Sequence, residues 1–267
     1  MKHLQKESLQ FELILKEVRN IRKLQPKYGT LKIFKELQNF FLEHNIKMGR
    51  DRFFKLMRWN NLLVKKSKNF TTTTNSKHRF FKNPNRILDL EIKQSEQVWV
   101  SDITYVKLQN DYAYLALVTD AYSKKIVGFN IDNHMRTELV VNALKMALKG
   151  RNFPERQIIH HSDRGIQYCS PEFEQYTLKN DIILSNTQNS DPYENAVAER
   201  MNRTLKYEYG LKETIPDLKT AQKMTQQAVH LYNNHRMHFS LDFQTPAKVH
   251  IKQNVKYKSY KRKKLVI

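Results

Sequence analysis

The sequence contains a single cysteine, Cys169, among 267 residues. One thiol cannot form an intramolecular disulfide, and it excludes a zinc site built on paired cysteines, despite the ten histidines. Disulfides and cysteine–zinc sites therefore do not hold this chain together.

Long apolar runs and abundant glycine are also missing. No apolar stretch approaches the roughly 20 residues of a membrane span, and the N-terminus, "MKHLQKESLQ", carries charges where a signal peptide needs an apolar core. Only six Gly, beside 14 Phe and 13 Tyr, exclude a collagen-like or disordered chain. We expect a globular, cytoplasmic protein of about two units with no membrane partner.

Acidic residues are scarce at both ends of the chain, and the net charge is +21. Residues 1–95 hold 22 Lys and Arg against 8 Asp and Glu, and residues 210–267 hold 12 against 3. Residues 96–209 hold 13 against 15 and are slightly acidic. Solvated lysine faces would spread more evenly, so the two basic flanks indicate a nucleic-acid partner, and the centre keeps carboxylates for another purpose.

The N-terminal segment, 1–64, is predicted to be helical. Apolar residues recur at helical spacing over 8–24, with Ser8 as N-cap, then over 31–44 and 49–63. Such a bundle suggests a helix-turn-helix-like domain whose last helix binds DNA. Its basic residues are Arg50, Arg52, Lys55 and Arg58. A basic bundle that does not touch DNA remains the alternative.

A mixed α/β domain is predicted over 96–210, after a polar, basic linker at 65–95 that contains four consecutive threonines. Three adjacent strand patterns are followed by alternating helix and strand patterns. This order predicts a ribonuclease-H-like mixed five-stranded sheet with flanking helices, although other α/β layouts fit the pattern alone. A helical extension at 211–267 ends in the basic tail "KYKSYKRKKLVI", which suits either a DNA contact or a solvated terminus.

Acidic residues interrupt this domain at informative places. Asp102 breaks a β-rich run, and Asp163 follows the predicted strand in "IIHHSDRGIQYCS". Polar side chains converge at strand ends, although a lone aspartate near Gly165 is also a common turn former. In "NAVAERMNRTLKYEYG", a helix would place Val197, Met201 and Leu205 on one face. Its opposite face carries Glu199, Arg203 and Lys206, beside Asn195 and Asn202.

The spacing of these acids, with 35 residues between Asp163 and Glu199, resembles the integrase-core or "DDE" transposases. The likeness is greatest to the second-frame proteins of the IS-three family of bacterial insertion sequences. It rests on "YGTLKIFKEL", "VWVSDITYV", "HHSDRGIQY", "NAVAERMNRTLKYE" and "YNNHRMHFSLDFQTP". The motif before the third acid departs from the family at one position: this chain has Glu194 where the family commonly has Asp. The substitution keeps the negative charge.

The resemblance implies a metal-dependent DNA transposase that nicks the element's 3′ ends and transfers the strands. Two Mg²⁺ or Mn²⁺ ions would be held by Asp102, bridging both, by Asp163 and by Glu199. Expected DNA contacts are Lys206, Arg203, Arg164, His161, Asn195 and Arg236, with Arg50, Arg52 and Lys55 in the helical domain. Pairing of Glu199 with Arg203 is the alternative for that arginine. His160 and His161 are rejected as magnesium ligands.

The implied partners are double-stranded DNA, both terminal inverted repeats and target, and at least one further copy of the chain. In similar elements an upstream reading frame supplies a helix-turn-helix protein, either separate or fused to this chain. We expect the protein to be associated with the bacterial nucleoid. A cellular ribonuclease H and a non-enzymatic DNA-binding regulator are the rival functions. The intact acidic triad argues against the regulator.

Overall fold

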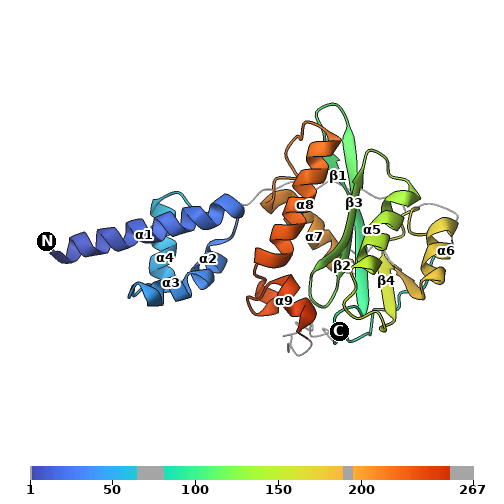
Figure 1. Ribbon diagram of the computed structural model, residues 1–267, viewed down its shortest axis with the longest axis horizontal. Helices are drawn as coiled ribbons and strands as arrows, with labels where there is room; N and C mark the ends of the chain where they lie inside the picture. The colour runs from blue at the N-terminus through green and yellow to red at the C-terminus, as the bar shows by residue number, and fades with distance from the viewer. Residues whose placement is uncertain (1, 65–80, 189–194, 253–267) are drawn as a thin grey trace, which may run out of the picture.

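The chain forms a five-stranded mixed sheet with helices on both faces, preceded by a group of one long and three short helices (Figure 1). It is described here from a computed structural model, which covers residues 2–64, 81–188 and 195–252. The helical group comprises α1 (Lys2–Leu24), α2 (Thr30–Glu36), α3 (Gln38–Glu43) and α4 (Arg50–Trp59). The sheet comprises β1 (Val98–Lys107), β2 (Tyr112–Asp120), β3 (Ile126–Asp132), β4 (Ile158–Ser162) and β5 (Ile182–Asn186). The later helices are α5 (Thr137–Lys149), α6 (Pro171–Lys179), α7 (Ala196–Glu208), α8 (Leu218–His235) and α9 (Pro246–Ile251), with a short 3₁₀ turn at Phe239–Leu241.

The strand order is β3-β2-β1-β4-β5. β1, β2 and β3 are antiparallel neighbours, whereas β4 pairs parallel with both β1 and β5. Short turns suffice for the antiparallel strands, and helices α5 and α6 make the longer connections that parallel strands require. The predicted mixed sheet is confirmed, with the predicted order of elements.

Alternation along β1 divides the core between two helical layers. Trp99 and Ile103 are buried with residues of α5, such as Leu144. On the opposite face, Val106 packs in a cluster with Leu205 of α7 and further residues of α8. Figure 1 shows α5 and α6 on one side of the sheet and α7 and α8 on the other. Asp102 lies on the α7 side, since it alternates with Ile103.

One glycine permits the close approach of α5 to the sheet. A Cβ atom added to Gly128 in β3 would lie 2.2 Å from the backbone oxygen of Ala143 and 2.9 Å from the Ala147 Cβ. Real Cβ atoms do not tolerate such separations, so any larger residue would push α5 off the sheet.

The helical domain has its own core, in which Ile14, Ile33, Phe53 and Met57 are fully buried. Two expectations fail here. Ser8 is not an N-cap, because α1 already begins at Lys2: residues 2–7 contain no Gly or Pro to stop the helix. The predicted helix over 31–44 is divided at Leu37, whose ψ of 2° departs from helical geometry.

The second half of the predicted linker, 81–95, packs on the sheet domain. The backbone amides of Asn83 and Arg86 donate to the side chains of Asn186 and Ser185, both across 2.9 Å. Ile87, Leu90 and Ile92 pack against a small buried cluster that includes Ala198 of α7. The threonine run lies outside the described residues.

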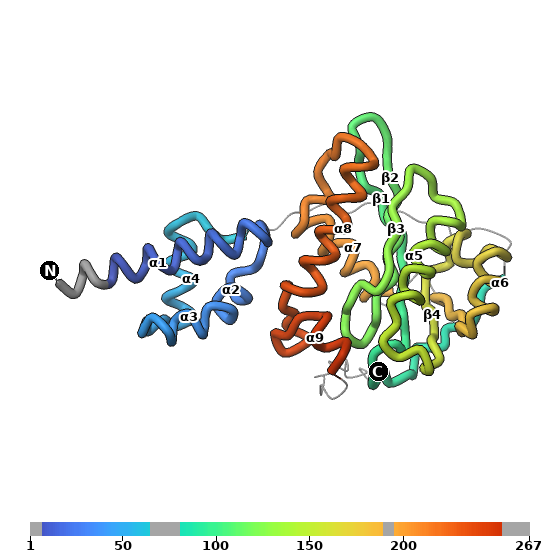
Figure 2. The backbone as a smooth tube through the Cα atoms, in the orientation of Figure 1, coloured from blue at the N-terminus to red at the C-terminus, as the bar shows by residue number. Residues whose placement is uncertain are grey.

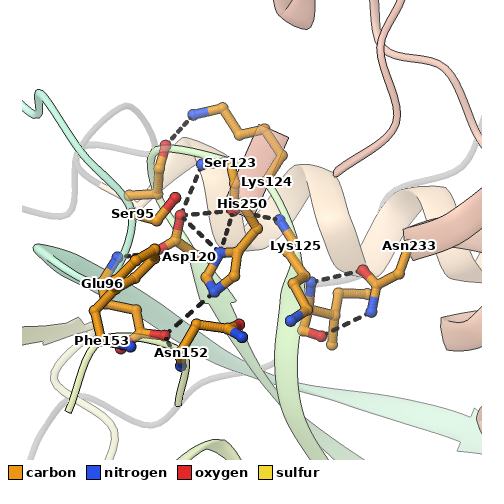
Figure 3. A network of polar contacts seen from close by, with 12 residues as sticks. Ser95, Glu96, Asp120, Ser123, Lys124, Lys125, Asn152, Phe153, Asn233 and His250 are labelled. Carbon is orange, nitrogen blue, oxygen red and sulfur yellow. Dashed lines mark hydrogen bonds and ion pairs between the residues drawn. The ribbon is translucent and has the colours of Figure 1, made fainter. Parts of the chain in front are cut away.

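A buried charge network fixes α9 to the sheet domain (Figure 3). The His250 ring is fully buried between Glu96 and Asp120, with Nε2 lying 3.3 Å from Glu96 Oε1. Arg151 Nε donates to the other Glu96 oxygen across 3.0 Å. The helical extension is thus part of the same folded body, although the basic tail after it is outside the described residues. None of the helices in the described ranges has the length and apolar character needed to span a membrane.

Candidate active site

Asp102 lies in the middle of β1 beneath α7. Its Oδ2 accepts a hydrogen bond from Asn202 Nδ2 across 2.8 Å, and its Oδ1 accepts one from the Ile103 amide across 2.9 Å. Burial of the carboxyl, followed by the nearby carboxylate of Asp163 and more weakly that of Glu199, raises the pKa of Asp102 to about 7. The half-buried Asp102 therefore shares a confined region with two other acids.

Asp163 follows β4 directly, next to β1 in the sheet. Its Oδ1 accepts from the Gly165 amide across 3.0 Å, and Asn186 Nδ2 donates to its backbone oxygen across 3.2 Å. A Cβ at position 165 would lie 3.0 Å from that same Oδ1, which favours Gly there. Asp163 thus forms a turn and also faces the acidic cluster, so the two interpretations of its sequence position are compatible.

Glu199 lies in the first turn of α7, with its side chain exposed. The start of this helix is tied to β1, because Asn195 Nδ2 donates to the Ser101 backbone oxygen across 3.0 Å. Burial and then the charge of Asp163 raise the pKa of Glu199. The three acids therefore interact electrostatically, although among the described residues no three His, Cys, Asp or Glu side chains are already arranged to hold a metal ion.

The two histidines before Asp163 are structural. His160 and His161 are 1% and 0% exposed. His160 Nε2 lies 2.7 Å from Ser101 Oγ, and His161 Nδ1 lies 2.9 Å from Ser185 Oγ. The predicted DNA contact at His161 is not supported, because a fully buried ring on β4 does not reach a DNA surface.

The remaining face of α7 is basic. Arg203 is exposed, with its guanidinium 5.8 Å from the centre of the Tyr207 ring. Lys206 is half-buried; burial lowers its pKa, and the Asp102 carboxylate acts in the opposite direction. Both cations thus lie on the helix that carries Glu199, and Lys206 is within electrostatic range of Asp102.

Several predicted DNA contacts are occupied within the protein. Asn195 is buried against Ser101, and Arg164 donates through Nε to the Thr187 backbone oxygen across 2.5 Å. Arg236 is 8% exposed and forms a bidentate pair with Glu208, at 2.7 and 2.6 Å. These side chains brace the fold, so the structure does not support direct DNA contacts by them.

Residues of α4, together with Leu31 of α2, line a basic hollow of about 390 Å³ in the helical domain. It is lined by Leu31, Arg50, Asp51, Phe54, Lys55 and Arg58. Arg52 points away from it: its guanidinium pairs with Glu7 and lies 5.3 Å from the centre of the Phe11 ring in α1. Of the predicted cations, Arg50 and Lys55 therefore share a surface with Arg58, and Arg52 does not.

Sequence reasoning missed the direct bond from Asn202 to Asp102. The signal available was spacing alone: Asn202 lies three residues after Glu199, nearly one helical turn, on the side of α7 that turns toward the sheet. A polar residue among the buried positions Ala198, Met201 and Leu205 marks such a contact.

Comparisons with known proteins identify the family of this chain. Two models of the integrase core domain match residues 93–192 and 180–246. The chain is 33% identical over 222 residues to the insertion element IS600 uncharacterized 31 kDa protein of Shigella sonnei, covering 82% of this chain and 80% of that protein. It is 31% identical over 227 residues to the transposase for insertion sequence element IS904 of Lactococcus lactis, covering 82% of this chain and 86% of that transposase.

The fold has a counterpart in a solved structure. A chain of the simian T-cell lymphotropic virus intasome, solved in complex with PP2A regulatory subunit B56 gamma, superposes with a TM-score of 0.52. The match covers 84% of this chain and 71% of that chain, at 16% identity, so it shows a shared fold alone. The two family models and the extent of the two sequence matches establish that the chain belongs to the insertion-sequence transposases that carry an integrase core domain.

Proposed function

We propose that this chain is a DNA transposase that nicks the ends of its insertion sequence at the 3′ side and joins them to a target. The observation that supports the proposal is the placement of the three acids: Asp102 lies in β1, Asp163 directly follows the neighbouring strand β4, and Glu199 lies at the start of α7, which Asn195 ties to β1. In keeping with this placement, Asp163 and Glu199 act to raise the pKa of Asp102. Family membership gives the class of reaction, and these three side chains are the candidates to perform it.

The donor set fits a hard divalent cation. The three acids offer only oxygen, and the Oδ1 atoms of Asn195 and Asn202 are buried nearby without a hydrogen-bond partner. Carboxylates that raise one another's pKa are stabilised when a cation enters between them. Asp102, Asp163 and Glu199 would therefore hold Mg²⁺ or Mn²⁺, and we propose two ions per site. Bound ions of this kind activate an attacking oxygen and stabilise a leaving one.

The surrounding residues position the DNA and the acids. Asn202 holds the Asp102 carboxyl in one orientation, and Asn195 ties the start of α7 to β1. Lys206 and Arg203 lie on the same helix as Glu199, where they would bind phosphates beside the site. Lys55 and Arg58 on α4 would bind DNA further from the cut, with Arg50 beside them.

The proposed assembly contains at least two copies of the chain, because an element has two ends that must be brought together. Its substrate is double-stranded DNA, both terminal repeats and target, which places its work on the nucleoid. A helix-turn-helix product of an upstream frame, separate or fused, is the further partner that we propose.

The decisive experiment compares Asp163→Asn with Asp181→Asn. Asp181 is an exposed turn residue with a φ of 54°, where Asn is equally well tolerated, so it controls for the loss of one carboxylate. We expect Asp163→Asn to abolish Mg²⁺-dependent nicking and joining of labelled element-end DNA while DNA binding persists. Asp181→Asn should behave like the wild type. Full activity of Asp163→Asn, or cutting of an RNA–DNA hybrid in preference to element ends, would overturn the proposal.

A further inference from the structure

The helical domain docks on the sheet domain through the loop between α1 and α2. Gln25, directly after α1, is 5% exposed and bonds across the junction with both ends of its amide. Its Nε2 donates to the His235 backbone oxygen at the end of α8, and its Oε1 accepts from the Tyr209 hydroxyl after α7, each across 3.3 Å. Figure 2 shows this end of α1 approaching α7 and α8.

Tyr28 makes a second contact in the same loop. Its side chain is 1% exposed, and its hydroxyl accepts from the Met237 backbone amide across 3.3 Å. The Tyr28 ring is itself part of the buried core of the helical domain. Tyr28 therefore joins that core to the segment that follows α8.

The junction is polar, desolvated and rich in cations. Burial lowers the pKa of Lys32 in α2 to about 8. The nearby charge of Arg236 also lowers this pKa, and that of Glu208 acts in the opposite direction. The single Glu208 carboxylate accepts both bonds from Arg236. An interface of this kind depends on matched hydrogen bonds, because a displaced donor or acceptor would stay buried without a partner.

The basic hollow adjoins the docked part of the helical domain. Lys55 and Arg58 of α4 line it together with Leu31 of α2, and Tyr28 and Lys32, close to Leu31 in the chain, lie at the junction with the sheet domain. The distance from this basic hollow to Asp102 is then fixed by the docking contacts.

We propose that Gln25 and Tyr28 are positioning residues that set which phosphodiester is cut, by holding the DNA-binding face of α4 at a fixed distance from the acidic site. The inference rests on the proposed function. It assigns the choice of cutting position to an interface within the chain, distant from the carboxylates that act on the phosphate.

The test uses the full chain with Gln25→Ala and Tyr28→Phe combined, and Glu12→Ala on the exposed side of α1 as the matched control. Cutting of end-labelled element DNA in Mg²⁺ is mapped at single-nucleotide resolution. Since each lost bond contributes a factor of several, we expect cutting at the wild-type position to fall about tenfold. New cuts should appear at neighbouring positions, with unchanged far-ultraviolet circular dichroism.

A covalent restraint separates positioning from a loss of stability. Lys27 and Glu213 lie at the junction, both exposed, with Nζ and Oε1 4.0 Å apart. Lys27→Cys with Glu213→Cys, joined by a short bismaleimide, should restore the wild-type cutting position to the Gln25→Ala, Tyr28→Phe variant. Cys169 is buried and leaves the added thiols as the reactive pair.

Two results would overturn the inference: an unchanged cutting position in the Gln25→Ala, Tyr28→Phe variant, or loss of cutting when the cross-link is made in an otherwise unaltered chain. The second would mean that the domains must separate to act. If the wild type does not cut element ends at all, the proposed function fails instead, and the yield of cross-link still reports whether the domains dock.

Discussion

The amide of Asn202 donates to the carboxylate of Asp102 across 2.8 Å, although the two residues are 100 positions apart. This bond joins α7 to the centre of β1, next to Glu199 on the same helix. The Asn202 side chain is buried, and its Oδ1 has no hydrogen-bond partner. One amide therefore orients an acid of the candidate site and presents a spare oxygen beside it.

Asn202→Ala should slow cutting by about 10- to 100-fold, the usual effect of removing a group that orients a metal-binding carboxylate. Single-turnover nicking of element-end DNA measures the effect, with DNA affinity followed in parallel. Asn180→Ala is the matched control, since Asn180 directly follows α6 and its side-chain amide donates to the Tyr176 backbone oxygen in that helix. Equal rates for the two variants would show that Asp102 needs no such support.

The pair of Arg236 and Glu208 should contribute to stability and not to DNA affinity. Arg236→Met leaves a largely buried carboxylate without its partner, a change that typically costs about 3–5 kcal/mol. Urea denaturation should therefore show a lower free energy of unfolding. Adding Glu208→Gln should recover part of the loss, because the unpaired charge is then gone. A variant of normal stability with weakened DNA binding would restore Arg236 as a DNA contact.

His250 should make stability fall as pH rises. Ser123 donates its hydroxyl proton to Asp120 and so accepts from His250 Nδ1, while Nε2 faces Glu96, so the ring is an imidazolium. Burial opposes this charge, but the nearby carboxylates of Asp120, 3.8 Å from Nδ1, and Glu96, 3.3 Å from Nε2, prevail over burial and Lys125, and the pKa of His250 is raised.

Because the pKa of His250 is raised in the folded protein, the charged ring stabilises the fold fully below about pH 6.5, the ordinary pKa of histidine. This stabilisation is lost as the pH rises through the pKa that His250 has in the folded protein. For Glu96, burial acts to raise the pKa, but bonds from His250, Asn152 and Arg151 lower it to about 2. The Glu96 contribution to stability is therefore lost as pH falls from about 4.5 toward 2.

Thermal unfolding between pH 5 and 9 tests the His250 contribution. The melting temperature of the wild type should decline over this range, and that of His250→Gln should lack this decline. Parallel curves for the two would contradict this assignment.

Periodicity in the sequence predicts most of the fold, because burial of alternate or helically spaced residues is a local property. Strand β1, with Trp99 and Ile103 on one face, and helix α7, with Met201 and Leu205 buried, were predictable in this way. The three acids were found through their spacing and the resemblance that it supports. The sequence also placed Asn202 beside Glu199, but it did not show the bond from Asn202 to Asp102 on a distant strand.

Sequence reasoning fails where a polar side chain chooses among partners distant in the chain. Arg236 and Arg52 look like DNA contacts in a basic segment, yet each finds an acid, Glu208 or Glu7, on a different helix. No local pattern distinguishes a cation that faces solvent from one that pairs inside the fold. Docking through Gln25 is hidden for the same reason, since its partners lie about 200 residues away.

The cations of α4 should differ in their effect on the salt dependence of DNA binding. Each phosphate contact contributes about 0.9 to the slope of log affinity against log salt concentration. Lys55→Ala and Arg58→Ala should each lower the slope by about that amount, because both side chains line the exposed hollow. Arg52→Ala is the internal control, since its guanidinium faces Glu7 and Phe11: it should lower stability and leave the slope unchanged. If Arg52→Ala lowers the slope as much as Lys55→Ala does, DNA binds across α1 and the outward face of α4 is not the binding surface.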